Sequence, residues 1–165
     1  MPRDASSGSL PFHPADDLPA LLSEVLKSAM YLVNADKGDV QLYDAARQSL
    51  LMTALHGFDA QFAAAFNVIP LGVAPCGTAA MRRARVVVAD SERDPLAADP
   101  MLRQAASDGE FRACASTPLI NAGGELLGVM TVHFRQPHPL TDAEAELLDA
   151  CARLAAERIE TCRGS

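Results

Sequence analysis

The chain has 165 residues, a length that suits one domain and lets about two-thirds of the unfolded chain's surface be buried on folding. Apolar residues make up 49% of it, which excludes an intrinsically disordered protein. The net charge of −7 argues against a nucleic-acid partner, because affinity for phosphate backbones comes mainly from lysine and arginine.

The cysteines have the spacing of free thiols. There is no C-x-x-C pair and no histidine at metal-ligand spacing, so we expect no structural zinc site. Cys151 and Cys162 fall in one predicted helix, about 16 Å apart along its axis, and therefore cannot bridge to each other. We expect all four to be reduced, as in a cytoplasmic protein: Cys76, Cys114, Cys151 and Cys162.

The N-terminal segment, residues 1–14, is predicted to be a flexible arm. It is rich in Ser, Pro and Gly and lacks the apolar run of a secretory signal. No stretch of the chain approaches the roughly 20 apolar residues needed to cross a bilayer. These features predict a soluble cytoplasmic protein with no membrane partner.

The first half of the chain predicts a helix followed by a hairpin. Asp16 or Asp17 can cap a helix whose apolar stripe continues to Val33 with a period of 3.6 residues. Apolar and polar residues then alternate in a strand over residues 39–44, which pairs with a second strand over residues 50–56. Two short elements follow: a helix over 58–66 and a strand over 67–71.

The second half predicts less regular elements and then a second hairpin. Pro75 can start a helix over 76–83, and Gly109 can end another over 101–107. A short buried strand covers residues 86–88. Two longer strands flank a turn that contains Gly-Gly, a common hairpin signal: residues 111–120 and 126–134.

The last element is a long helix to about Cys162. Thr141 and Glu144 form a predicted capping box at its start. Two hairpins and two amphipathic terminal helices predict an α+β fold, with an antiparallel sheet and both terminal helices on one of its faces.

Short motifs in a fixed order carry a resemblance to a known family. They are Cys76-Gly77-Thr78-Ala79-Ala80, Val86 to Asp90, Asp94-Pro95, Ser116 to Ile120 and Gly123 to Val129. Together they resemble the GAF domains, most closely those of bacterial sensor histidine kinases. The resemblance covers nearly the whole chain, which we divide into the arm and a GAF domain over residues 15–163.

The resemblance implies a six-stranded antiparallel sheet, with the terminal helices on one face and a ligand pocket on the other. GAF domains bind small molecules or partners, and many serve as dimerising transmitters. It implies a sensory domain that signals through its terminal helices to an output such as a histidine kinase. Fold alone does not select the ligand.

Polar residues within apolar segments mark the candidate pocket. On the last strand, Thr131 and His133 are predicted to share the pocket face with Leu127 and Val129. The opposite face is apolar and is assigned to the helices: Leu126, Gly128, Met130, Val132 and Phe134. The remaining candidates are Cys76, Gly77, Thr78, Asp90, Cys114 and Ser116. Each also has a purely architectural interpretation.

No cofactor is required by these residues. The Cys-His pair of bilin-binding members is absent, as is the Asn-Lys-Phe-Asp-Glu signature of cyclic-nucleotide-binding members. A haem would need His56 or His133 as its axial ligand. We expect any ligand to be small and not covalently attached.

Two alternatives remain open. Cys76-Gly77-Thr78-Ala79 is similar to a segment of the free methionine-R-sulfoxide reductases, but residues 95–108, where those GAF enzymes carry catalytic cysteines, contain none. The other alternative is a ligand-free dimerisation module. We expect a non-enzymatic domain that forms a homodimer through its terminal helices, because the apolar stripes of those helices look wider than one sheet face can bury.

Overall fold

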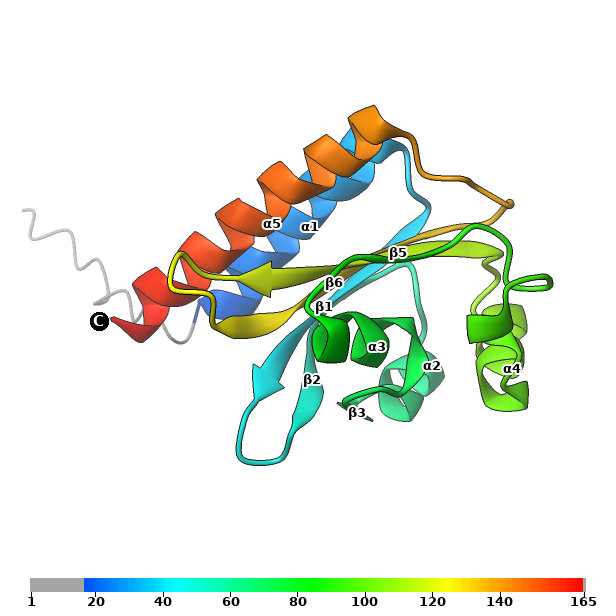
Figure 1. Ribbon diagram of the computed structural model, residues 1–165, viewed down its shortest axis with the longest axis horizontal. Helices are drawn as coiled ribbons and strands as arrows, with labels where there is room; N and C mark the ends of the chain where they lie inside the picture. The colour runs from blue at the N-terminus through cyan, green and yellow to red at the C-terminus, as the bar shows by residue number, and fades with distance from the viewer. Residues whose placement is uncertain (1–16, 165) are drawn as a thin grey trace, which may run out of the picture.

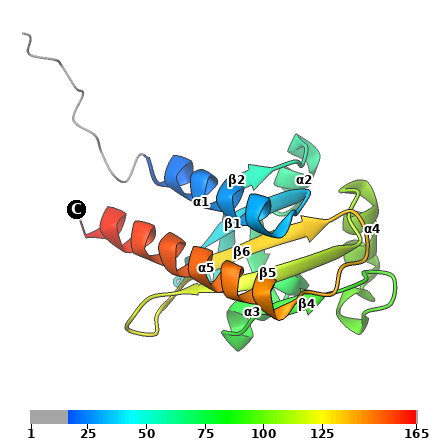
Figure 2. The same ribbon diagram turned by 90° about the horizontal axis from the view of Figure 1, so that it is seen from above.

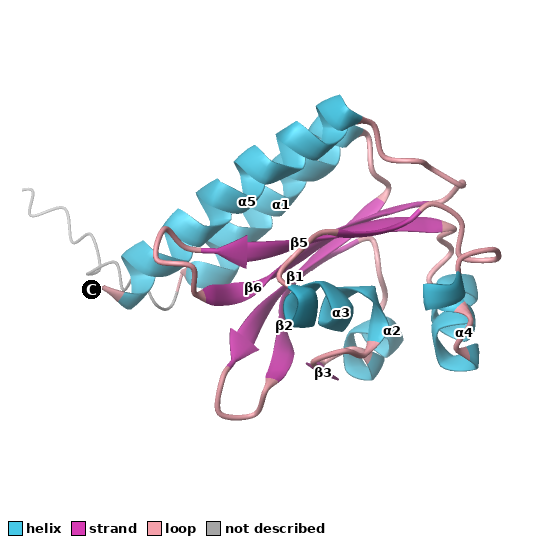
Figure 3. Ribbon diagram, viewed as in Figure 1, coloured by secondary structure: helices cyan, strands magenta, loops and turns pink. Residues whose placement is uncertain are grey.

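A computed structural model describes residues 17–164 of the protein. It has one antiparallel sheet of six strands in the order β3-β2-β1-β6-β5-β4 (Figures 1 and 3). The strands are β1 Lys37–Asp44, β2 Ser49–His56, β3 Val68–Pro70, β4 Val86–Val88, β5 Ala113–Ile120 and β6 Leu126–Phe134. The helices are α1 Leu18–Val33, α2 Ala60–Ala65, α3 Ala74–Arg82, the 3-10 turn η1 Pro95–Ala97, α4 Pro100–Asp108 and α5 Asp142–Arg163. The α+β fold and both hairpins are as predicted.

The terminal helices α1 and α5 lie side by side across one face of the sheet (Figures 1 and 2). Their apolar stripes meet the sheet in the main core, where Leu22, Ala29, Ala155 and Ile159 have no exposed surface. The small alanines let the helix backbones come close to their neighbours. No helix in residues 17–164 has both the length and the apolar content to cross a membrane.

The opposite face is covered by shorter pieces. Helices α2, α3 and α4 lie there (Figure 3), and a second cluster of buried residues forms around Leu50, Ile69, Val86 and Val129. β6 is consequently buried along its whole length, with core on both faces. That explains why its sequence is almost continuously apolar and why its two polar residues stand out.

The helix ends confirm one predicted cap and correct another. The capping box at α5 is present, with Glu144 N–H donating to Thr141 Oγ1 and Thr141 N–H to the Glu144 carboxylate. Asp17 occupies the N-cap position of α1, but its side chain accepts no capping hydrogen bond because its backbone is helical rather than extended. Asp16 and the predicted arm lie outside the described residues. Past α4, the positive φ falls on Glu110 rather than on Gly109.

The predicted faces of β6 are right from Val129 to Phe134 and wrong at its start. Leu127 packs in the core under α1 and α5, and Leu126 packs on the opposite face. The cause is an irregularity in the pairing with β5: Leu119 pairs with Gly128, but Ile120 pairs with Leu126. The unpaired Leu127 breaks the alternation of side chains, which the sequence pattern does not reveal.

Candidate functional site

A partly open cavity of about 60 Å³ lies on the sheet face opposite the terminal helices. Its floor is formed by polar side chains from the three neighbouring strands β1, β6 and β5. In the pairing register Asp39 faces Thr131, which faces Ser116, and Cys114 faces His133. Because alternate residues of a strand share a face, these side chains form one polar patch in the middle of the sheet.

The ceiling of the cavity is apolar. Phe62 comes from α2 and Phe66 from the C-cap that follows it, Leu102 and Ala106 come from α4, and Phe111 from the segment before β5. The Phe111 and His133 rings meet edge to face with centroids 4.5 Å apart, and Phe62 stacks on Phe66 at 4.6 Å. The site therefore combines a polar floor with an aromatic ceiling, as small-molecule pockets commonly do.

A buried side-chain hydrogen bond joins two strands of the floor. His133 Nε2 lies 2.9 Å from Asp39 Oδ2, and both side chains are almost fully buried. Beside them Lys37 Nζ donates to the Gly109 carbonyl and lies 5.0 Å from the centre of the Phe58 ring. With Nε2 engaged by Asp39, Nδ1 is the ring nitrogen of His133 that is left for a further partner.

Two hydroxyl groups satisfy each other next to that pair. The oxygens of Ser116 and Thr131 are 2.8 Å apart, and both residues are buried. Since each hydroxyl can donate once and accept twice, the pair keeps capacity for a further partner.

Three buried polar atoms have no hydrogen-bond partner within residues 17–164: both amide atoms of Gln41 and Nδ1 of His133. Gln41 is fully buried and lines the cavity. The Gln41 side chain makes a weak contact with the Cys76 thiol, which lowers the pKa of that thiol against the larger effect of burial, but the contact does not reach the geometry of a full hydrogen bond. A buried amide without partners is costly, so these atoms are the features of the site that most need a ligand group or water.

The two cavity thiols are poor nucleophiles. Burial, followed by the negative charge of Asp39, raises the pKa of Cys76 to about 12. Burial, followed by the neighbouring Cys76, raises the pKa of Cys114 still further. Both thiols therefore stay protonated at neutral pH, whereas nucleophilic cysteines need a lowered pKa. No disulfide or metal-binding cluster of His, Cys, Asp or Glu occurs in the described part of the chain.

Five of the eight residues selected from the sequence line the cavity: Cys76, Cys114, Ser116, Thr131 and His133. The other three do not line it. Gly77 and Thr78 are buried within α3, where a Cβ on Gly77 would lie 2.5 Å from the Pro70 carbonyl oxygen. Asp90 accepts hydrogen bonds from Arg112 Nη2 at 2.9 Å and from the Glu92 backbone N–H.

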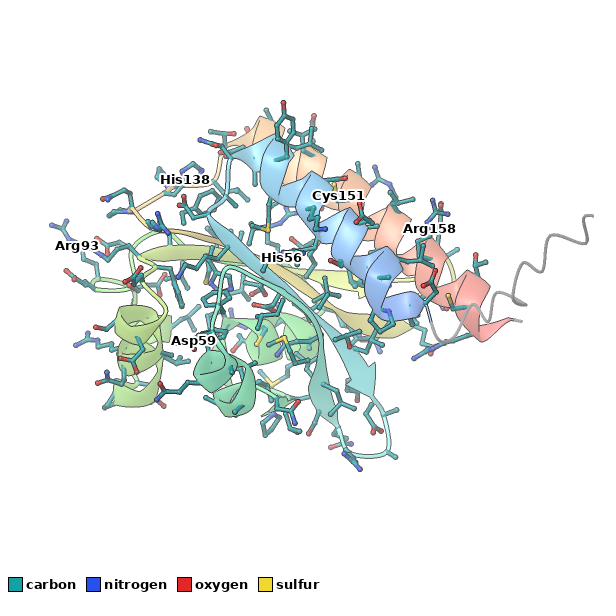
Figure 4. The ribbon with its side chains drawn as sticks, turned by 180° about the vertical axis from the view of Figure 1, so that it is seen from behind. His56, Asp59, Arg93, His138, Cys151 and Arg158 are labelled. Carbon is teal, nitrogen blue, oxygen red and sulfur yellow. The ribbon has the colours of Figure 1, made fainter. Side chains whose placement is uncertain are left out.

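Sequence reasoning missed Asp39 and Gln41. The available signal was the alternation of these two polar residues with Val40 and Leu42. In a strand that lies between two others and has both faces covered, polar side chains of this kind point into a buried site. His56, considered above as a haem ligand, does not line the cavity; its Nε2 lies 2.9 Å from Ser23 Oγ of α1 (Figure 4). A cavity of about 60 Å³ is also far smaller than a haem.

Comparisons with known proteins agree with this architecture. The GAF domain family profile matches residues 17–159. A "Methyl sulfide methyltransferase-associated sensor" of Methanosarcina acetivorans is 31% identical over 123 residues, which are 73% of this chain but only 12% of that protein. The chain thus corresponds to a small part of that relative.

Two solved structures show the same fold. A domain assigned to a two-component sensor histidine kinase of Sinorhizobium meliloti 1021 aligns with a TM-score of 0.73 and 17% identity, covering 87% of this chain and 91% of that one. The free methionine-R-sulfoxide reductase of Neisseria meningitidis, in complex with its substrate, aligns with a TM-score of 0.72 and 21% identity, covering 90% and 81%. At these identities the likeness concerns the fold alone.

Proposed function

Since this chain belongs to the GAF domain family, we propose that it is a sensory domain that binds a small ligand in the cavity between β1, β6, β5 and the short helices. Binding is transmitted through the terminal helices to a signalling output in the cytoplasm, such as a histidine kinase. The relative named as a sensor and the likeness to a domain of a kinase protein support this assignment.

One observation carries the proposal: a fully buried Gln41 amide, with no hydrogen bond of normal geometry, borders the cavity. Interiors rarely leave both amide atoms of a side chain unpaired. The pocket residues we assign to the ligand are Cys76, Cys114, Ser116, Thr131 and His133, together with Asp39 and Gln41. Gly77, Thr78 and Asp90 shape the surrounding backbone.

The central strand offers a direct route for the signal. On β6, Thr131 and His133 face the cavity, and Met130 and Val132 pack in the core beneath α1 and α5. A ligand that shifts β6 would therefore change the packing of both terminal helices, because a close-packed core transmits displacement.

The same helices supply the proposed dimer interface. Leu147 and Leu154 of α5 and Tyr31 and Leu32 of α1 are large apolar side chains with at least a third of their surface exposed. Leu147 and Leu154 lie two turns apart and so share one side of α5. A second copy of the chain would cover them in a four-helix arrangement with two-fold symmetry.

Native mass spectrometry of freshly purified protein tests ligand binding. We expect a co-purifying mass that is released on denaturation. Ala106→Leu, which adds bulk to the cavity wall, should abolish it, and Ala64→Leu on the exposed side of α2 should not. A ligand-free wild-type protein that no small molecule stabilises would support the dimerisation module instead.

A second candidate function follows from the structural likeness to a methionine-R-sulfoxide reductase and from the place of Cys76 in the cavity. The raised pKa of the Cys76 and Cys114 thiols argues against it. A turnover assay with free methionine-R-sulfoxide and a dithiol reductant distinguishes the two functions. Turnover that is lost in Cys76→Ser would establish the enzyme.

A further inference from the structure

The cavity floor has a hydrogen-bonding pattern that specifies a class of ligand. Gln41 carries a carbonyl acceptor and an N–H donor side by side, and neither makes a hydrogen bond of normal geometry in the described chain, since the contact with the Cys76 thiol is a weak one. A ligand edge with a donor next to an acceptor would pair with both atoms at once, as two amides do in a cyclic dimer.

The charges of the lining restrict the ligand further. Asp39 is the only carboxylate among the lining residues, and neither lysine nor arginine is among them. The nearby Lys37 ammonium is directed to the Gly109 carbonyl and the Phe58 ring. An anionic ligand would be buried beside Asp39 without a lysine or arginine partner, which is strongly unfavourable.

Size and wall chemistry complete the description. A volume of about 60 Å³ holds about four to six water molecules, comparable to one six-membered ring. Phe62, Phe66 and Phe111 present ring surfaces to it. The ceiling therefore favours a compact ligand with an apolar body, and the floor favours one polar edge.

We propose that the cavity selects a small uncharged molecule with a cis-amide edge, an N–H beside a C=O, which Gln41 reads through two hydrogen bonds. This rests on the ligand-binding function proposed above. His133 Nδ1 and the Ser116–Thr131 hydroxyl pair lie on the same floor and offer further positions for polar substituents.

The test uses three near-isosteric probes in isothermal titration calorimetry: 2-piperidone, N-methyl-2-piperidone and cyclohexanone. The first has a donor and an acceptor, and the other two have only the acceptor. We expect wild-type protein to bind 2-piperidone at least about fivefold more tightly than the others, since it makes one more net hydrogen bond, which contributes about 1 kcal/mol, and 1.4 kcal/mol is tenfold.

Gln41→Met should bind the three probes with affinities within about threefold of one another, because the paired donor and acceptor are gone. This variant should fold, since it replaces two unpartnered buried polar atoms with apolar ones. Gln61→Met, at an exposed position of α2, should retain the wild-type preference.

Equal binding of all three probes by the wild type, or a preference that survives in Gln41→Met, would overturn the amide assignment and leave ligand binding intact. Tighter binding of the anion cyclopentanecarboxylate than of 2-piperidone would also overturn the amide assignment and leave ligand binding intact. Binding of no probe, together with no response to a broad metabolite library, would defeat both the assignment and the proposed sensory function.

Discussion

His133 Nε2 and Asp39 Oδ2 lie 2.9 Å apart across the central strand pair, 94 residues apart in the sequence. Lys37 pairs with His133 and Asp39 with Thr131, so the contact runs diagonally between β1 and β6. It brings the first hairpin and the second together at the floor of the cavity. This side-chain contact thus adds to the backbone pairing of β1 with β6 at the floor of the cavity.

Removing Asp39 should destabilise the protein, because the buried His133 ring then loses the hydrogen bond at Nε2 and Nδ1 already has no partner in the described chain. We expect Asp39→Ala to lower the free energy of unfolding by about 1–3 kcal/mol in urea denaturation. The double variant Asp39→Ala/His133→Ala should lose less than the sum of the two single variants. Strict additivity would show that the pair is not coupled.

Cys76 should make the protein less stable at high pH. Its pKa is raised from 9.0 to about 12, so below pH 9 folded and unfolded states are both protonated and stability is complete. As the pH rises above 9, the unfolded state loses this proton first, and the free energy of unfolding falls by up to about 1.4 kcal/mol per pH unit.

Cys76→Ser is the matched variant, since serine is nearly isosteric and does not titrate in this range. Its free energy of unfolding, measured in urea between pH 8 and about 10.5, should fall less steeply than that of the wild type. Identical slopes would mean that Cys76 does not retain its proton in the folded state.

Gly128→Ala should be strongly destabilising. A Cβ at this position would lie 2.2 Å from the Gln41 carbonyl oxygen on the neighbouring strand, so β1 would have to move. We expect a loss of about 2 kcal/mol or more in the free energy of unfolding. Gly123→Ala in the β5–β6 turn is the control, because its nearest neighbour would be 3.5 Å away. Comparable losses in both would contradict the crowding at Gly128.

Charge at the exposed leucines of α5 should separate the dimer without unfolding the chain. The wild type should sediment at twice its 17.5 kDa mass, and Leu147→Glu/Leu154→Glu should sediment as a folded monomer. Leu148 and Ile159 are buried within one chain, so charging them would unfold it and would not test the interface.

Met81→Glu provides the control for this experiment. Met81 is a large exposed apolar residue on α3, on the other face of the sheet, so its substitution should leave the dimer intact. A wild-type protein that stays monomeric up to about 100 µM would refute the interface.

Much of the architecture was predictable because its signals are local. The capping box at Thr141, the apolar stripes of α1 and α5 and the Gly-Gly turn at residues 123–124 each act within a few residues. The pocket face of β6 also followed from the alternation of Thr131 and His133 with Met130 and Val132.

The interior of the site depends on contacts between strands that are distant in the sequence. Asp39 and Gln41 look like the solvent-facing residues of a half-buried strand until the sheet places β1 between β2 and β6 and the short helices cover it. The faces of Leu126 and Leu127 are exchanged for a similar reason, because one unpaired residue in the β5–β6 pairing reverses the alternation.

The sequence alone therefore determined the family resemblance, the order of the elements and most of the core, since periodicity and capping are encoded within short segments. Only the tertiary structure decided which polar side chains meet in the cavity, that Asp39 partners His133, and that Gln41 is buried without a partner. Strand pairing sets these relationships, and it joins residues whose separation along the chain carries no local signal.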